Sequence, residues 1–354
     1  MSISSETGLS PFTICKPTGL FAKAIYSGRN FVYWSIAVLQ LIDGSIWTIE
    51  MLMAQRISSK IIFSICAITA FTLATFMAVV WRNLNKFIDI FYHFERNVNI
   101  NLLCSSLPPY LKMHRLIIKI HAILCFSCFF PLQIYSTFAI QFDSSLIVWK
   151  YIVLFVIRTM GLFIFYSFLG FLIQTFLYIQ SCFLQVEHEI HTLNASNREL
   201  DIVSIRQIRY VYCIAIENTE MLNSFLFFLI GQQFILSFVA THSSLAALIA
   251  NPNFIATVIT FGNIMTFSLV IYHMIYINHL ATRIYEQVYS FSFKTDSLKV
   301  SKEIQLLLTR IARADVGFTF LDIFVITPTC VTSLATISLT IALATPALVK
   351  FVRF

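Results

Sequence analysis

Arg158 and Asp43 are charged residues that lie inside long apolar stretches of the chain. A charge in the hydrocarbon layer of a membrane costs at least about 2.5 kcal/mol on insertion scales, so each side chain should face protein, water or an opposite charge. Asp43 is therefore the candidate partner of Arg158. Two interpretations stay open for Arg158: a buried ion pair or a guanidinium that reaches the membrane surface, and a ligand contact, since guanidinium offers fixed donors to hydroxyl or carboxylate groups.

Eight further side chains with polar or aromatic groups lie at middle or outer depth in the same stretches. Glutamine and asparagine at such depths often only bridge helices, and tryptophan near an interface often anchors a span. The alternative for each is a place in the wall of a ligand pocket. With Asp43 and Arg158, these residues make up the predicted pocket: Trp47, Gln133, Tyr135, Trp149, Gln232, Gln233, His242 and Asn263.

Motifs for catalysis do not occur in the sequence. It has no HExxH, no GxSxG, no Walker loop and no glycine-rich dinucleotide fingerprint. Residues 187–191 combine Glu and His, but a solvated helix explains them better than a metal site. We therefore expect no enzyme activity, no cofactor and no metal.

Long apolar stretches must position these side chains. Hydrophobic residues make up 58% of the chain and charged residues only 12%, against roughly 25% charged in soluble domains. Each stretch is long enough to cross a hydrocarbon layer of about 30 Å as a helix. The sequence thus predicts an all-α membrane protein with seven transmembrane helices, over residues 31–51, 61–81, 116–140, 146–178, 222–249, 254–277 and 320–349.

Lysine and arginine are unevenly divided between the two sides of these predicted spans. One side holds 18 of the 24 basic residues and the other only 5. The richer side should be cytoplasmic, which places the N-terminus inside and the C-terminus outside the cell. The net charge of +7 then reflects this bias and attraction to anionic membrane lipid rather than nucleic-acid binding.

The loops between the spans divide the chain into six parts. The outer loops are short, and the inner segments are long and carry apolar residues at helical spacing, notably in 202–221 and 298–314. Such amphipathic helices either pack on their own neighbours or form a compact intracellular domain where subunits meet. The parts are a cytoplasmic N-terminal segment 1–30, spans one to four in 31–181 with a cytoplasmic loop 82–115, a cytoplasmic helical extension 182–221, spans five and six in 222–278, a cytoplasmic helical segment 279–319, and the last span with a short outer tail in 320–354.

Two short runs resemble landmarks of the insect gustatory receptor family. Leu-Asn-Ser-Phe at 222–225 opens the fifth span, and Gly-Phe-Thr-Phe-Leu-Asp at 317–322 opens the last. This family belongs to the insect chemoreceptor superfamily, which also contains the odorant receptors. The resemblance implies a multi-pass plasma-membrane protein that forms a homo- or hetero-tetramer with related subunits. It also implies a cation channel that is gated by a small-molecule tastant, with a central pore lined by the last helix and a pocket in the outer halves of the others.

The end of the last span departs from the family pattern of Thr-Tyr, five residues and Gln-Phe. With Phe351 as the anchor, Leu343, Ala344 and Lys350 replace the Thr, Tyr and Gln. A ring of lysines would oppose cations, unless Lys350 reaches to the outer headgroups instead. The same anchor gives a helical face that either lines the pore or packs on neighbouring helices. Its members are Thr332, Thr336, Leu339, Leu343 and Lys350.

Other receptor and transporter classes fit the sequence less well. A G-protein-coupled receptor would carry an acid-Arg-Tyr triplet after the third span and Asn-Pro-x-x-Tyr in the last, and neither occurs. A transporter would favour two repeated halves with broken helices, which the prolines do not mark symmetrically. The sequence therefore predicts a taste chemoreceptor acting as a ligand-gated cation channel subunit, with a heptahelical G-protein-coupled receptor or an odorant-type subunit as the alternatives.

Overall fold

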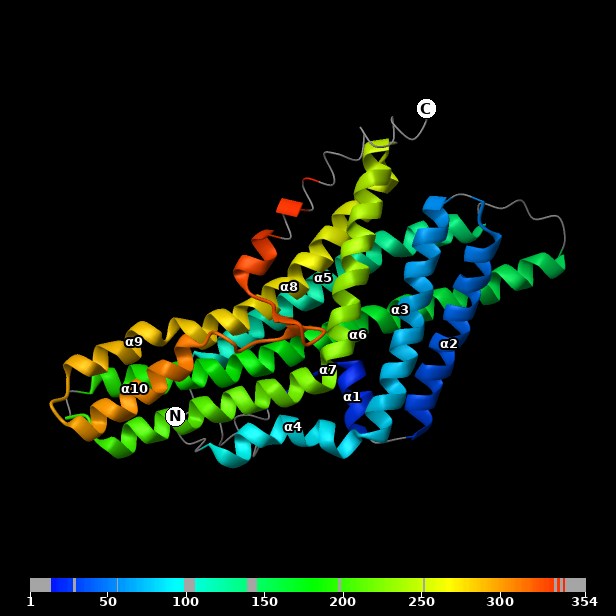
Figure 1. Ribbon diagram of the computed structural model, residues 1–354. Helices are drawn as coiled ribbons and strands as arrows, with labels where there is room; N and C mark the ends of the chain where they lie inside the picture. Colours follow the sequence, from blue (N-terminus) through cyan, green and yellow to red (C-terminus); the bar gives the residue numbers. More distant parts are fainter. Residues whose placement is uncertain are drawn as a thin grey trace.

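The computed structural model describes residues 14–27, 30–55, 57–98, 106–138, 145–196, 199–250, 252–333, 336–337 and 340. These residues are almost entirely helical, as the sequence predicts, apart from one two-stranded hairpin (Figure 1). The elements are α1 (Leu20–Ser27), α2 (Asn30–Met53), α3 (Ile57–Arg82), α4 (Leu84–Asn97), α5 (Leu107–Phe138), α6 (Ser145–Ala195), α7 (Ile202–Ala250), α8 (Phe254–Arg283), α9 (Tyr285–Ser290), the 3-10 turn η4 (Phe291–Phe293), α10 (Leu298–Ala312), β1 (Thr319–Phe320) and β2 (Phe324–Val325).

Six helices of the described residues are long and apolar enough to cross a membrane. They coincide with the first six predicted spans, and their outward surfaces carry many exposed large apolar side chains, as expected for contact with lipid. The chain is thus a multi-pass membrane protein. The six segments are Asn30–Met53, Lys60–Arg82, Leu107–Pro131, Tyr151–Ala195, Ile202–Ile249 and Phe254–Phe293.

Two very long helices, α6 and α7, form the axis of the molecule. α6 has 51 residues, so it extends about 75 Å at 1.5 Å per residue, more than twice the hydrocarbon layer. α2 and α3 pack on one another and against α6 and α7, while α5 and α8 pack along α6 (Figure 1). The predicted extension 182–221 is accordingly the end of α6 and the start of α7, both continuous with their spans.

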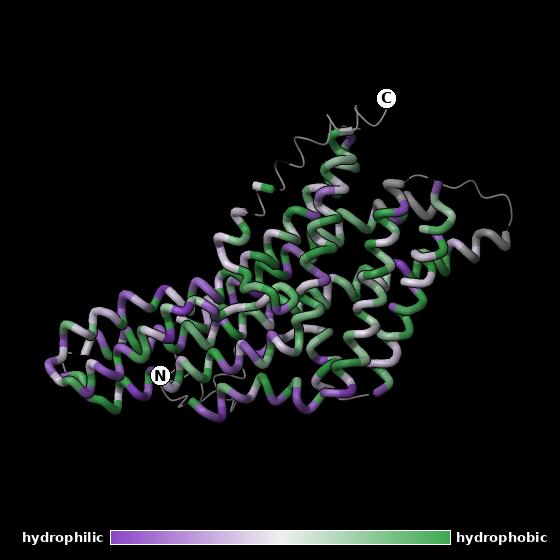
Figure 2. Tube along the Cα trace, in the orientation of Figure 1, coloured by the Kyte–Doolittle hydropathy of each residue, from purple (hydrophilic) through white to green (hydrophobic). Residues whose placement is uncertain are grey.

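Short amphipathic helices pack where α6 and α8 end and α7 begins. α10 buries Val300, Ile304, Leu307 and Ile311 at helical spacing, and the phenylalanines of α4 do the same. Polar residues gather around this end of the molecule, where α9 and α10 lie (Figure 2). Within one subunit, these helices therefore bury their apolar faces against their own neighbours.

The predicted start of the last span is wrong, because residues 319–325 form a β-hairpin rather than a helix. Phe320 pairs with Phe324, so three residues connect the strands. Leu321 and Asp322 have φ angles of 49° and 57°, the positive values that the two central residues of a type I′ turn have. The Ile323 N–H donates to the Phe320 carbonyl at 2.9 Å. A short apolar run such as this fits a strand and a helix equally well by periodicity, and its Leu-Asp turn lacks the usual Asn-Gly signal. Helical structure begins at Pro328, and the span predicted beyond residue 340 lies outside the described residues.

Candidate functional site

Arg158 of α6 is held by one face of α2. Its guanidinium forms an ion pair with the Glu50 carboxylate, and its Cζ lies 4.3 Å from the centre of the Trp47 ring. The Arg158 side chain is only 7% exposed, against 28% for Glu50. Asp43, Trp47 and Glu50 are separated by four and three residues, so they share a helix face that is directed at α6. We call these four residues the Arg158 cluster.

Asp43 lies beside this ion pair rather than in it. Its Oδ2 would be 2.5 Å from a Cβ added at Gly161, so the carboxylate is packed against α6 where only glycine leaves room for it. Glu50 was not among the predicted site residues, although its position seven residues after Asp43 places it on the same helix face. The cluster thus combines two carboxylates with a single guanidinium.

Two buried polar atoms of the Arg158 cluster have no hydrogen-bond partner: Nε of Arg158, a donor, and Oδ1 of Asp43, an acceptor. Buried polar groups are normally paired, so unpaired ones need an explanation. A hydroxyl group can accept from one atom and donate to the other at the same time. The cluster therefore holds one donor and one acceptor with unused hydrogen-bonding capacity.

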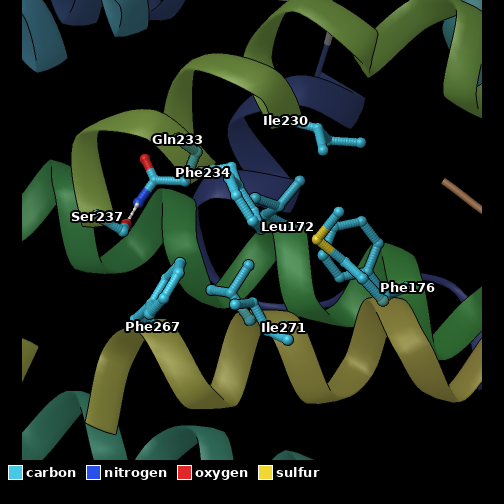
Figure 3. A pocket seen from close by; sticks show the side chains of 10 residues that line it. Leu172, Phe176, Ile230, Gln233, Phe234, Ser237, Phe267 and Ile271 are labelled. Atoms are coloured by element: carbon cyan, nitrogen blue, oxygen red, sulfur yellow. Dashed lines mark hydrogen bonds between the residues drawn. The ribbon is translucent and has the colours of Figure 1, made fainter. Parts of the chain in front are cut away.

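Gln233 of α7 lines two small cavities between the helices. The first lies between α6, α7 and α8, where the Gln233 Nε2 donates to the Ser237 Oγ at 3.0 Å (Figure 3). The second lies between α3, α6 and α7 and is also lined by Gln232. Each has a volume of about 10 Å³, which is room for about one water molecule. A ligand could enter here only if the surrounding side chains moved.

The other predicted pocket residues are dispersed. Asn263 Nδ2 of α8 donates to the Ala240 carbonyl of α7 at 3.5 Å, and Gln232 Nε2 donates to the Ile68 carbonyl of α3 at 3.5 Å, so both bridge helices. The His242 Nδ1 lies 2.8 Å from the Phe238 carbonyl of its own helix. Trp149 is 69% exposed.

Two predicted pocket residues lie on α5. Gln133 is half-buried, and the Tyr135 side chain lies outside the described residues. Among the candidates whose side chains the structure describes, Asp43, Trp47 and Arg158 meet in one cluster, and Gln232 and Gln233 line one cavity.

The predicted pore face is described only in part. Thr332 and Thr336 are exposed, and their hydroxyls donate to the carbonyls of Thr329 and Thr332 in the same helical segment. Leu339, Leu343 and Lys350 lie outside the described residues.

Asn223 joins the two runs on which the family resemblance rests. Its Oδ1 accepts from the Thr319 N–H at 2.9 Å, and its Nδ2 donates to the Thr319 Oγ1 at 2.9 Å and to the Asp322 Oδ1 at 3.3 Å. The Thr319 hydroxyl also donates to the Asp322 Oδ1 at 2.7 Å. We call these three residues the Asn223 clasp. Residues almost a hundred positions apart are thereby fastened where α7 meets the hairpin.

No protein-family model and no curated protein matches the chain. Among solved structures, the insect olfactory receptor OR5 from Machilis hrabei is similar, with a TM-score of 0.60, 15% identity, and coverage of 89% of this chain and 88% of that one. The same receptor in complex with eugenol gives a TM-score of 0.59 at 14% identity, covering 94% of this chain and 95% of that one. The chain therefore shares the fold of an insect olfactory receptor over nearly its whole length.

Proposed function

We propose that this chain is a taste chemoreceptor that acts as a subunit of a ligand-gated cation channel in the plasma membrane. The observation that carries the proposal is the fold, which matches an insect olfactory receptor over 94% of the chain. The resemblance of residues 222–225 and 317–322 to gustatory receptor landmarks favours the taste class. The proposed active form is a homo- or hetero-tetramer with related subunits, with the N-terminus in the cytoplasm and the C-terminus outside.

The proposed ligand is a small hydroxylated molecule that binds at the Arg158 cluster. The unpaired Arg158 Nε and Asp43 Oδ1 support this, because one is a donor and the other an acceptor, and a hydroxyl group can serve both kinds of atom. The Trp47 ring offers an apolar face to the rest of the molecule. Ligand binding would open the channel only if the open state binds the ligand more tightly than the closed state does.

The proposed pore is lined by the helix that begins at Pro328. Its face would carry Thr332 and Thr336 toward one end, Leu339 and Leu343 as apolar rings that can gate by dewetting, and Lys350 at the outer end. The exposure of Thr332 and Thr336 in the single subunit is compatible with this role, because a pore-lining surface is not covered within one subunit.

An odorant-type receptor is the second candidate, and it is favoured by the eugenol complex of the structural neighbour. The two classes differ in ligand rather than in fold, so ligand response must separate them. A heptahelical G-protein-coupled receptor is the third candidate, and it differs in mechanism.

Electrical recording from cells that express this chain alone tests the proposal. We expect currents evoked by sugars or bitter compounds that persist in excised membrane patches without nucleotides, since a channel needs no G protein. A response to volatile aromatic compounds such as eugenol, but to no tastant, would favour the odorant class. Ligand-dependent G-protein activation without any current would contradict the channel mechanism.

A further inference from the structure

We propose that Asn223 is a positioning residue that sets the resting position of the helix beginning at Pro328, through the Asn223 clasp. The consequence for channel gating rests on the proposed function, whereas the positioning itself does not. Asn223 is buried, and both the oxygen and the nitrogen of its side-chain amide form hydrogen bonds with the hairpin. A side chain used in this way holds the turn of the hairpin and its first strand against α7 at the same time.

The hairpin is fixed to α7 at three successive levels. The first level is Asn223. The second is Gly231, eight residues further along α7, where the Leu321 side chain fills the space and an added Cβ would lie 2.3 Å from the Leu321 Cδ2. The third level is Phe234 of α7, against which the Phe320 ring of β1 packs edge-on with 5.4 Å between the ring centres. Phe234 also lines the cavity between α6, α7 and α8 that Gln233 borders (Figure 3). The hairpin therefore contacts the same stretch of α7 that surrounds this cavity.

The backbone of the turn is held in a conformation that is intrinsically unfavourable for its residues. Leu321 has φ 49°, a left-handed region that a leucine rarely adopts, since its Cβ meets the backbone there. The clasp and the Gly231 contact supply the interactions that keep it. Loss of the clasp should therefore let the turn relax rather than leave it unchanged.

Very little chain separates the hairpin from the next helix. Only Ile326 and Thr327 lie between β2 and Pro328. The Ile326 N–H donates to the Phe318 carbonyl at 2.9 Å and its side chain is fully buried, while the Thr327 hydroxyl accepts from the Cys330 N–H at 3.3 Å. A shift of the hairpin must therefore displace the first turn of the helix.

A carboxylate exchange tests the clasp. In N223D, an aspartate replaces the amide donor and faces the Asp322 carboxylate, so the two like charges should push the hairpin away from α7. In D322N, the new amide can still accept the two hydrogen bonds that Asp322 accepts. In N223D/D322N, an amide donor faces a carboxylate acceptor again, which restores the pairing in reverse.

Cys330 is a native reporter of the helix position, because it lies in the first turn and is half-buried. We expect N223D to raise the rate of Cys330 modification by N-ethylmaleimide in the purified full-length protein by about tenfold, measured by peptide mass spectrometry. D322N and N223D/D322N should stay close to the wild-type rate. The exposed Cys213 of α7 is the internal control, and its own modification rate should be the same in every variant. N263D, which alters another asparagine that bridges helices, is the matched variant and should leave the Cys330 rate unchanged.

A steric pair repeats the test without a charge, in case N223D does not fold. G231A should raise the Cys330 rate because its methyl group collides with Leu321, and G231A/L321A should restore it. In cells, we expect N223D and G231A to pass more sodium current without ligand than wild type at equal surface density.

The outcomes separate the positioning role from the channel function. A Cys330 rate that neither N223D nor G231A changes would overturn the positioning role, as would a change that the paired second substitutions fail to reverse. Altered and rescued Cys330 rates with no sodium current in any form of the protein, including wild type, would support the positioning role and contradict the channel.

Discussion

At the residue scale, the Arg158 cluster shows how a charge is tolerated inside an apolar bundle. The guanidinium has an acid partner, Glu50, and an aromatic face, Trp47, and both come from one face of α2. Asp43 adds a second carboxylate that packs against Gly161. Such a cluster is a strong constraint, because removing one member of a buried pair leaves the other without compensation.

Replacing Arg158 should therefore impair the protein more than replacing its partner. We expect R158A to lower the amount of protein at the cell surface and its melting temperature, since the buried Asp43 and the half-buried Glu50 carboxylates would lose their counter-charge, at a cost of up to about 3–5 kcal/mol. Surface labelling and a thermal unfolding assay in detergent measure this.

The double variant R158A/E50Q should recover part of the loss, and E50Q alone serves as the control. Normal stability of R158A together with loss of ligand response would instead assign Arg158 to ligand contact alone. Normal stability and normal response would remove the cluster from the proposed function.

Glu303 of α10 offers a second test at the residue scale, since it receives Arg206 Nε at 2.8 Å and Arg209 Nη2 at 3.0 Å. The hydrogen bond from Arg206, followed by the charge of Arg209, lowers the pKa of Glu303 below its usual value. A carboxyl group with a lowered pKa in the folded state stabilises the fold above its unfolded pKa of about 4.3, and this contribution is lost as the pH falls through the folded pKa.

The acid limb of the stability profile should therefore become shallower in E303Q. We expect wild type and E303Q to differ in melting temperature at pH 6 and to converge below about pH 4. D296N, which alters an exposed carboxylate just before α10, is the control and should follow wild type. A constant difference between wild type and E303Q across the whole range would mean that the ionised carboxylate contributes nothing.

At the element scale, α10 and α4 show why the amphipathic segments fold within one subunit. Their apolar faces are buried against α7 and its neighbours, while exposed apolar residues such as Leu298 and Leu306 remain on the outside. The buried face contributes to the stability of the single chain, and the exposed residues are available for contacts between subunits.

Adjacent leucines of α10 separate these two roles. Leu307 is fully buried and Leu306 is 45% exposed. We expect L307A to cost about 2–5 kcal/mol, as for other leucines deleted from a core, whereas L306A should cost little because its side chain is already partly in solvent. Thermal unfolding of both variants measures the difference, and equal losses would contradict the packing of α10 that we describe.

At the scale of the whole molecule, six long apolar helices and the fold of an insect olfactory receptor define a multi-pass membrane protein. The uneven distribution of lysine and arginine predicts its orientation in the membrane. A seventh span, formed by the helix that begins at Pro328, would place the two termini on opposite sides of the membrane.

The positions of the termini test this orientation. An epitope at the N-terminus should bind antibody only after the cells are permeabilised, and one placed after Phe354 should bind on intact cells, because loops rich in lysine and arginine are expected to stay in the cytoplasm. Both epitopes on the same side would mean an even number of crossings, and the reversed pattern would support the G-protein-coupled class.

Hydropathy along the chain was sufficient to predict the helical class and the first six spans, because an apolar run of span length has few other stable structures in a membrane. It also placed Asp43 and Arg158 among the candidate residues, since a charge at that depth needs a partner, and Trp47 as an aromatic residue near the outer interface. Only the tertiary structure decided that Glu50 pairs with Arg158, that Asp43 packs on Gly161 and that the other pocket candidates lie apart. Residues 319–325 became a hairpin for the same reason: Asn223 and Gly231, almost a hundred positions earlier, hold a turn that its own residues do not favour.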